Sequence, residues 1–229
     1  MSDQQFTYEI LADELYQSDL NFKIIIIGDS GVGKSCLTMK GIKNVFEEFY
    51  SPTVGFEFFT FNIKINDKSI KLQIWDTCGQ EVYRSLVSSF YKNSSLAVIV
   101  YAINDENSFN NIESWINEMK SQANPNIKLF LIGNKLDLES NRTISKERAE
   151  RFSKDFGFDY FMETSAKTGF NATNLFVQAA KILYEQNLLY KDRASRPTAF
   201  QMYKDEQEDQ QHNIILDVDD KPKRKGCCG

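Results

Sequence analysis

Residues 23–37 read KIIIIGDSGVGKSCL, and they contain the pattern GxxxxGK(S/T) between Gly28 and Ser35. The apolar run at residues 24–27 predicts a strand before the pattern, and a helix is expected after it. Glycines let backbone N–H groups approach an anion closely, and the N-terminus of a helix attracts it. This stretch therefore predicts an α/β fold with a phosphate-binding loop for a nucleoside triphosphate.

The loop supplies a cation and a metal ligand. Lys34 would reach the terminal phosphates, and the Ser35 hydroxyl would bind Mg²⁺. The remaining residues would surround the phosphates with backbone N–H groups. We predict nucleotide contacts from the whole run, namely Gly28, Asp29, Ser30, Gly31, Val32, Gly33, Lys34, Ser35 and Cys36.

Composition excludes several classes of protein. Of the 229 residues, 41% are hydrophobic, which is enough for one core, and the net charge of −5 argues against nucleic-acid binding. The four cysteines lack the spacing of a disulfide framework or zinc site, so we expect a reducing compartment. The single histidine, His212, argues against histidine catalysis. Because a signal-peptide pattern and long apolar runs are absent, we expect neither secretion nor a membrane span.

Hydrophobic periodicity predicts the sheet and its helices. Residues 59–65 and 70–74 alternate apolar and polar side chains, which is typical of a β-hairpin with one buried face. Continuous apolar runs at 96–101 and 127–132 indicate parallel strands covered on both faces. A further strand is expected at 158–162, and apolar stripes predict helices within 109–119, 149–156 and 175–183. We predict a six-stranded, mostly parallel sheet with one antiparallel edge hairpin strand and helices on both faces.

The ends of the chain differ from its middle. Residues 1–21 contain Ile10, Leu11 and Leu15, which allow a short helix, but we expect a loosely held extension. Residues 191–229 are polar, charged and aperiodic, which predicts a flexible tail. The predicted domain spans residues 22–190.

Three further motifs follow predicted strands. In WDTCGQE, Asp76 would bind Mg²⁺, the Gly79 backbone would approach the γ-phosphate, and Gln80 would orient an attacking water as the catalytic residue. In NKLD, the Asp137 carboxylate can accept hydrogen bonds from the ring N–H and the exocyclic amine of guanine. Adenine lacks that pattern, and a site of this kind can reject such an analogue by about 10⁴ to 10⁵. In TSAK, the Ala166 N–H would bind the base carbonyl. The base-binding residues we predict are Asn134, Lys135, Asp137, Ser165, Ala166 and Lys167.

The motifs GDSGVGKS, WDTCGQE, NKLD and TSAK, with a loop bearing Thr53 between the first two, resemble the Ras superfamily of small GTPases over about residues 22–190. Within it the chain is most similar to Rab proteins, because Trp75 opens WDTCGQE, VGFEF follows Thr53, and two cysteines stand near the C-terminus. The resemblance implies the small G domain of P-loop NTPases. Cys78, where the family usually has alanine, and Val82-Tyr83, where it usually has Arg-Phe, depart from the pattern.

The resemblance also implies roles for the loops. Thr53 would join Ser35 and Asp76 as Mg²⁺ ligands in the GTP state, and Phe46 would stack against guanine. Residues 46–55 and 79–90 would be two switch segments whose surfaces differ between GTP and GDP forms. Because no residue looks placed as an arginine finger, we expect slow hydrolysis that needs an activating protein.

The tail predicts a membrane anchor. In the family, terminal paired cysteines such as Cys227 and Cys228 are geranylgeranylated, and the basic run at 221–225 would suit an anionic membrane or a nuclear import receptor. Two lipid chains with basic residues give stable attachment. The expected location is the cytoplasmic face of intracellular membranes, with a soluble cytosolic pool.

The sequence thus predicts a Rab-like GTPase that binds Mg²⁺ and GTP or GDP and directs vesicle traffic. Its expected partners are an activating protein, an exchange factor, a GDP-dissociation inhibitor, the prenylation machinery and effectors. One alternative is a guanine-nucleotide-dependent scaffold with little hydrolysis, suggested by Cys78 and Val82-Tyr83, although Gln80 argues against it. An ATP-using kinase is disfavoured by NKLD.

Overall fold

The computed structural model describes residues 6–12, 17–48, 53, 55–78 and 90–195. The chain divides into two units, residues 1–185 and 186–229. The first unit holds the sheet and the helices packed on it. Of the second unit, the described part is the end of the last helix. Within the described residues, no helix is both long and apolar enough to cross a membrane.

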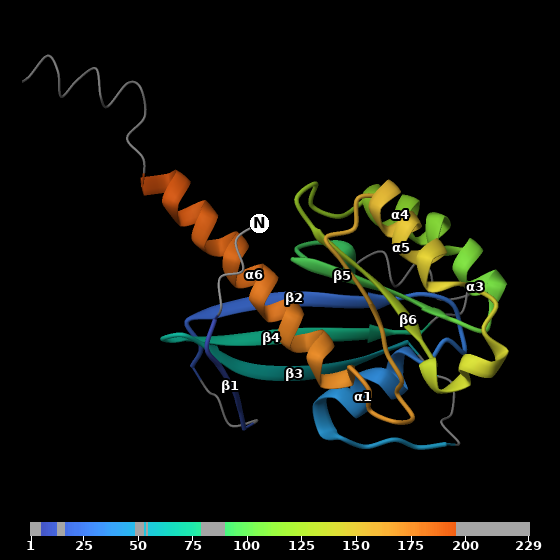
Figure 1. Ribbon diagram of the computed structural model, residues 1–229. Helices are drawn as coiled ribbons and strands as arrows, with labels where there is room; N and C mark the ends of the chain where they lie inside the picture. The colour runs from blue at the N-terminus through green and yellow to red at the C-terminus, as the bar shows by residue number, and fades with distance from the viewer. Residues whose placement is uncertain (1–5, 13–16, 49–52, 54, 79–89, 196–229) are drawn as a thin grey trace, which may run out of the picture. The chain divides into compact units, whose positions relative to one another are not determined.

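Seven strands form one sheet in the order β1-β3-β4-β2-β5-β6-β7 (Figure 1). Strands β2, β4, β5, β6 and β7 run parallel to one another, whereas β3 pairs antiparallel with both β4 and β1. The predicted mostly parallel sheet with an antiparallel edge is confirmed, with one strand more than expected. The strands are β1 (Tyr8–Leu11), β2 (Leu20–Ile27), β3 (Phe56–Ile65), β4 (Lys68–Thr77), β5 (Leu96–Ala102), β6 (Lys128–Asn134) and β7 (Tyr160–Glu163).

Helices cover both faces of the sheet because the central strands are apolar on both sides. In β2, Ile24 and Ile26 pack into one buried cluster with residues of α1 and α6, while Ile25 and Ile27 pack into another with residues of α3, α4 and α5. The predicted helix within 109–119 is two helices separated at Asn111. The helices are α1 (Lys34–Lys43), α3 (Glu106–Asn110), α4 (Ile112–Lys120), the 3₁₀ helix η2 (Leu136–Asn141), α5 (Lys146–Asp155) and α6 (Ala172–Ser195).

The extra strand corrects the interpretation of the N-terminal extension. Ile10 and Leu11 lie in β1, paired with Ile63 and Asn62 of β3, and not in a helix. Four residues are too few to show a clear period, and the strand's partner lies about fifty residues further along the chain, so local sequence does not reveal the pairing.

Candidate nucleotide-binding site

The phosphate loop connects the carboxyl end of β2 to the N-terminus of α1. Gly28 and Gly33 have φ values of 136° and 93°, which residues with a Cβ rarely adopt. A Cβ at Gly28 would collide with the carbonyl oxygen of Val100, and one at Gly33 would lie 2.6 Å from Nδ2 of Asn134. Both glycines are therefore required by the close approach of β5 and β6.

Lys34 folds back over this loop. Its Nζ donates to the carbonyl oxygens of Gly28 and Asp29, both at 2.8 Å, and the residue is buried. Burial lowers the pKa of Lys34 to about 8, although the carboxylates of Asp76 and Asp29 oppose the change. The side chain thus brings a buried cationic group to the centre of the loop, where a phosphate would need it.

The three predicted metal ligands lie together. Oγ of Ser35 and Oγ1 of Thr53 are 2.7 Å apart, and Asp76 is completely buried at the end of β4. Among the described residues, neither carboxylate oxygen of Asp76 has a hydrogen-bond partner of good geometry. Burial raises the pKa of Asp76 to about 7, and the nearby Ser35 hydroxyl and Lys34 ammonium oppose this only in part. One unpaired carboxylate and two hydroxyls fit Mg²⁺, which prefers oxygen ligands and few protein carboxylates when phosphates complete its coordination.

Asn134, the last residue of β6, joins the phosphate side to the base side. Its Nδ2 donates to the carbonyl oxygen of Val32 at 2.9 Å. Its Oδ1 accepts from Oγ1 of Thr164 at 3.1 Å and from the backbone N–H of Ala166 at 3.2 Å. One buried amide therefore fixes the positions of the phosphate loop and the TSAK segment relative to each other.

Asp137 is held by the TSAK segment. Oγ of Ser165 donates to Oδ1 of Asp137 at 2.6 Å, and the N–H of Leu136 donates to the carbonyl oxygen of Thr164 at 3.0 Å. The second carboxylate oxygen of Asp137 has no hydrogen-bond partner among the described residues. The structure thus brings Asn134, Asp137 and Ser165 together, and their predicted contacts with the base stay a prediction.

Some predicted nucleotide contacts look different in the structure. The Ala166 N–H donates to Asn134 in the structure, and its predicted hydrogen bond to the base carbonyl stays a prediction.

The Asp29 carboxylate points away from the loop and accepts from Nδ2 of Asn111 at 2.7 Å and Nε1 of Trp115 at 2.8 Å. It thereby ties the loop to the junction of α3 and α4.

The other predicted nucleotide contacts that the structure describes have the following surroundings. Phe46 is partly buried against the hydrophobic cluster under α1 and α6. Nζ of Lys167 lies 3.7 Å from a carboxylate oxygen of Glu48. Lys135 has a φ of 67°, and Cys36 is half buried, which raises the pKa of its thiol. Gly79, Gln80, Cys227 and Cys228 lie outside the described residues, as do most of the second switch segment and the tail.

Sequence reasoning missed Arg142. Its guanidinium donates to Glu139 at 2.6 Å and to Glu163 at 2.6 Å, which joins the segment after NKLD to the strand before TSAK. These three residues line a cavity of about 440 Å³ beside η2. The spacing offered a signal, because a basic residue follows NKLD and an acidic residue directly precedes TSAK, but such charges are usually solvated.

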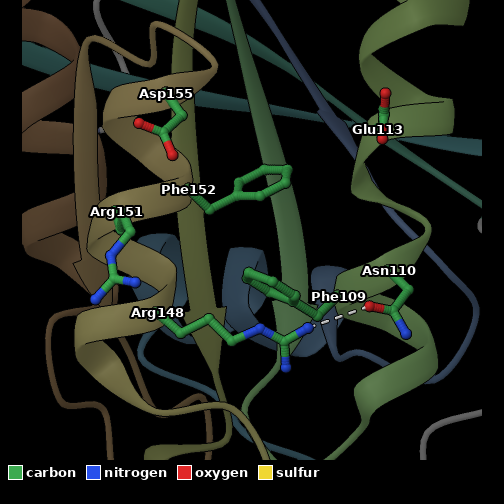
Figure 2. A pocket seen from close by; sticks show the side chains of 7 residues that line it. All are labelled: Phe109, Asn110, Glu113, Arg148, Arg151, Phe152 and Asp155. Carbon is green, nitrogen blue, oxygen red and sulfur yellow. Dashed lines mark hydrogen bonds between the residues drawn. The ribbon is translucent and has the colours of Figure 1, made fainter.

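A second cavity lies between α3, α4 and α5. It has a volume of about 290 Å³, and Figure 2 shows Arg148 reaching across it toward Asn110. The Arg148 guanidinium stacks 4.8 Å from the centre of the Phe109 ring and pairs with Glu106 at 2.5 Å. Because these contacts pack helix against helix and include no predicted site residue, we assign this cavity no part in nucleotide binding.

A comparison with protein-family models matches residues 23–185 to the model described as Ras family. The matched range contains the phosphate loop, Asp76, NKLD and TSAK. It leaves out residues 1–22, including β1, and the residues after 185.

Proposed function

Because the chain belongs to the Ras family of small GTPases, we propose that it is a Rab-like switch which regulates vesicle and membrane trafficking. Family membership establishes a guanine-nucleotide-binding GTPase domain. The Rab-like role, the slow rate of hydrolysis and the lipid anchor are our proposals. They rest on particular residues of this chain.

The proposal that this chain binds guanine rests mainly on the position of Asn134. Its side chain links the phosphate loop to TSAK, while Asp137, three residues later, presents a carboxylate oriented by Ser165. A carboxylate held in this way accepts from two adjacent N–H groups of guanine, and adenine cannot supply both. Base selectivity therefore resides in groups that are already in position.

On the phosphate side, Lys34 would neutralise the terminal phosphates, and Ser35, Thr53 and Asp76 would hold Mg²⁺. The bound ion supplies positive charge against the phosphate oxygens. We propose that Gln80 orients the attacking water. No arginine among the described residues lies in the phosphate loop or at the end of β4, so an activating protein would supply the missing cation.

An exposed aromatic surface supports recognition of effectors. Phe56 and Phe58 on β3 are 47% and 49% exposed, and they contact Trp75 at ring distances of 5.2 and 5.1 Å. Phe90, at the end of the second switch segment, contacts both Phe56 and Trp75. Exposed apolar patches of this kind mark protein-binding surfaces. Because both switch segments adjoin it, a partner bound here would sense the nucleotide state.

We further propose that Cys227 and Cys228 carry two lipid chains and that residues 221–225 add attraction to an anionic membrane. The GTP form would act on the cytoplasmic face of intracellular membranes. The GDP form would return to a soluble pool through a GDP-dissociation inhibitor. An exchange factor and the prenylation machinery complete the cycle.

To test these proposals, three forms of the full chain are expressed in eukaryotic cells. They are the wild type, the Gln80→Leu variant, and a double variant with Cys227→Ser and Cys228→Ser. Cell fractions and single-turnover phosphate release from the purified proteins are measured. We expect slow release in the wild type that Gln80→Leu abolishes, more Gln80→Leu protein on membranes, and the double serine variant in the soluble fraction. Undiminished membrane association of the serine variant would refute the anchor. Tight GTP binding without release in the wild type would favour the scaffold.

A further inference from the structure

The N-terminal strand is an addition to the matched domain. The family match begins at residue 23, whereas β1 occupies Tyr8–Leu11 and pairs with Asn62–Ile65 at one end of β3. The strand lies at the edge of the sheet, beyond β3 (Figure 1). It therefore covers backbone groups that the rest of the domain would leave as an open sheet edge.

The hydrogen-bond pattern shows which residues of β1 face β3. The N–H of Asn66 donates to the carbonyl oxygen of Thr7 at 3.0 Å, so these two residues form a hydrogen-bonded pair at the start of the ladder. In an antiparallel ladder such pairs alternate, and the register makes Glu9 with Lys64 and Leu11 with Asn62 the next ones. The N–H groups of Glu9 and Leu11 therefore face β3, whereas those of Tyr8 and Ile10 face outward.

Among the described residues, few side-chain contacts besides the 3.3 Å hydrogen bond from Thr7 to Asn66 hold the strand in place. The Phe6 ring meets the buried Tyr184 ring edge to face at 5.5 Å, and Nζ of Lys181 lies 4.6 Å from the centre of the Tyr8 ring. Tyr8 and Ile10 remain 49% and 47% exposed. A strand that buries so little apolar surface can detach while the rest of the domain stays folded.

The covered edge is only part of the edge available. Strand β3 pairs with β4 over its whole length, but β1 reaches only Asn62–Ile65 on the other side. Among the described residues, no strand pairs with residues 56–61 on that side. By the same alternation, Phe56, Phe58 and Thr60 direct their backbone groups to this edge. Release of β1 would give a continuous edge along the ten residues of β3.

We propose that β1 is an exchangeable strand, which yields the edge of β3 to an extended segment of a partner protein. The partner segment would share the features by which β1 is held. It would carry an acidic residue opposite Lys64, as Glu9 is in β1, and an aromatic residue three positions earlier to pack on Tyr184, as Phe6 does. Lys64 and Tyr184, which would recognise the segment, are not among the residues assigned to the nucleotide site or to the switch segments. This recognition is therefore separate from the proposed switch.

Two proline variants of the full chain test whether β1 covers the edge of β3 as described. Glu9→Pro removes an N–H that faces β3, whereas Ile10→Pro, next to it, removes one that faces outward. Hydrogen exchange at the amides of Asn62, Lys64 and Asn66 is measured, with GDP affinity as a check on the fold. We expect exchange at least about tenfold faster in Glu9→Pro and near wild type in Ile10→Pro, with GDP affinity unchanged in both. Equal exchange in the two variants would overturn the assigned pairing.

A synthetic peptide with the sequence of residues 5–12, QFTYEILA, serves as the probe for exchange. We expect it to bind Glu9→Pro at least about tenfold more tightly than wild type, because in the wild type β1 competes from within the chain. It should also restore protection at Lys64, and the same peptide with proline in place of its glutamate should not. Equal binding to both proteins, or no protection, would overturn the proposal. A dimer of Glu9→Pro without peptide would overturn it in favour of a second copy at this edge.

Discussion

The base side and the metal side of the nucleotide site differ in how completely their polar side chains are paired. On the base side, Asn134 makes hydrogen bonds to Val32, Thr164 and Ala166, and Ser165 donates to Asp137. On the metal side, Asp76 is equally buried, yet neither of its carboxylate oxygens has a partner of good geometry in the part of the chain that the structure describes. The carboxyl ends of the strands therefore hold one hydrogen-bonded network, around Asn134, and one buried carboxyl group without a well-placed partner among the described residues.

The difference separates two tasks. Groups that are already hydrogen-bonded in position lose little freedom when a ligand binds, so the base side is suited to setting affinity and selectivity. A buried carboxylate without partners is unfavourable, and its raised pKa reports that cost. A divalent cation would remove the cost. The metal side is thus suited to coupling stability to Mg²⁺ and to the phosphates that help hold it.

The largest effect is expected on the base side. Asp137→Ala should weaken GDP binding by about 10⁴-fold, because the two N–H groups of guanine lose their acceptor. Glu139→Ala, on the same 3₁₀ helix, is the matched control, since its side chain pairs with Arg142 and is largely exposed. It should change affinity only a few-fold. Titration calorimetry measures both variants, and a loss below about tenfold in Asp137→Ala would refute the role of this carboxylate.

A smaller effect is expected on the metal side. In EDTA with excess GDP, the free energy of unfolding of the wild type should fall as pH rises from about 4 to about 7, by on the order of 2 to 4 kcal/mol. The sign follows because the pKa of Asp76 is raised in the folded state, so the unfolded chain ionises first and binds fewer protons. This contribution to stability is thus present at low pH and is lost as the pH rises to the pKa that Asp76 has in the folded protein.

Asp76→Asn should flatten this pH dependence, and it should also remove the stabilisation that Mg²⁺ gives to the complex. Chemical denaturation at several pH values, with and without Mg²⁺, measures both effects. Thr77→Ser, at the adjacent buried residue whose hydroxyl donates to Ile26, is a control that keeps the hydroxyl. The interpretation fails if the wild type and Asp76→Asn respond equally to Mg²⁺.

The sequence predicted those parts of the site in which a local pattern carries the chemistry. The apolar run at 24–27 gave a strand buried on both faces, and the glycines after it gave the loop. The grouping of Asn134 with Ser165 followed from motifs at the ends of neighbouring parallel strands. In each case the decisive signal is a short local pattern, either an apolar run followed by glycines or a motif directly after a predicted strand.

The features that were missed depend on contacts between distant residues. The pairing of β1 with β3 joins residues more than fifty positions apart, and the Asp29 carboxylate bonds to Trp115, 86 positions later. Similarly, the Ala166 N–H turns to Asn134 because that amide also bridges to the phosphate loop. A single sequence does not encode such choices locally, since they are decided by which groups the fold brings together.

The smallest predicted effect tests whether the base side acts independently of the metal. Ser165→Ala removes the 2.6 Å hydrogen bond to Asp137, a bond to a charged group, and should speed GDP dissociation about tenfold. Ser140→Ala is the control, because its hydroxyl donates to the exposed Asn141 and not to Asp137. Stopped-flow release of a fluorescent GDP analogue measures the rates. The ratio of the GDP dissociation rate of Ser165→Ala to that of the wild type should be the same in Mg²⁺ and in EDTA. The reason is that Ser165 orients the carboxylate and does not touch the metal ligands. A ratio that vanished in EDTA would mean that the two sides are coupled, most directly through Asn134, and the division of tasks would be wrong.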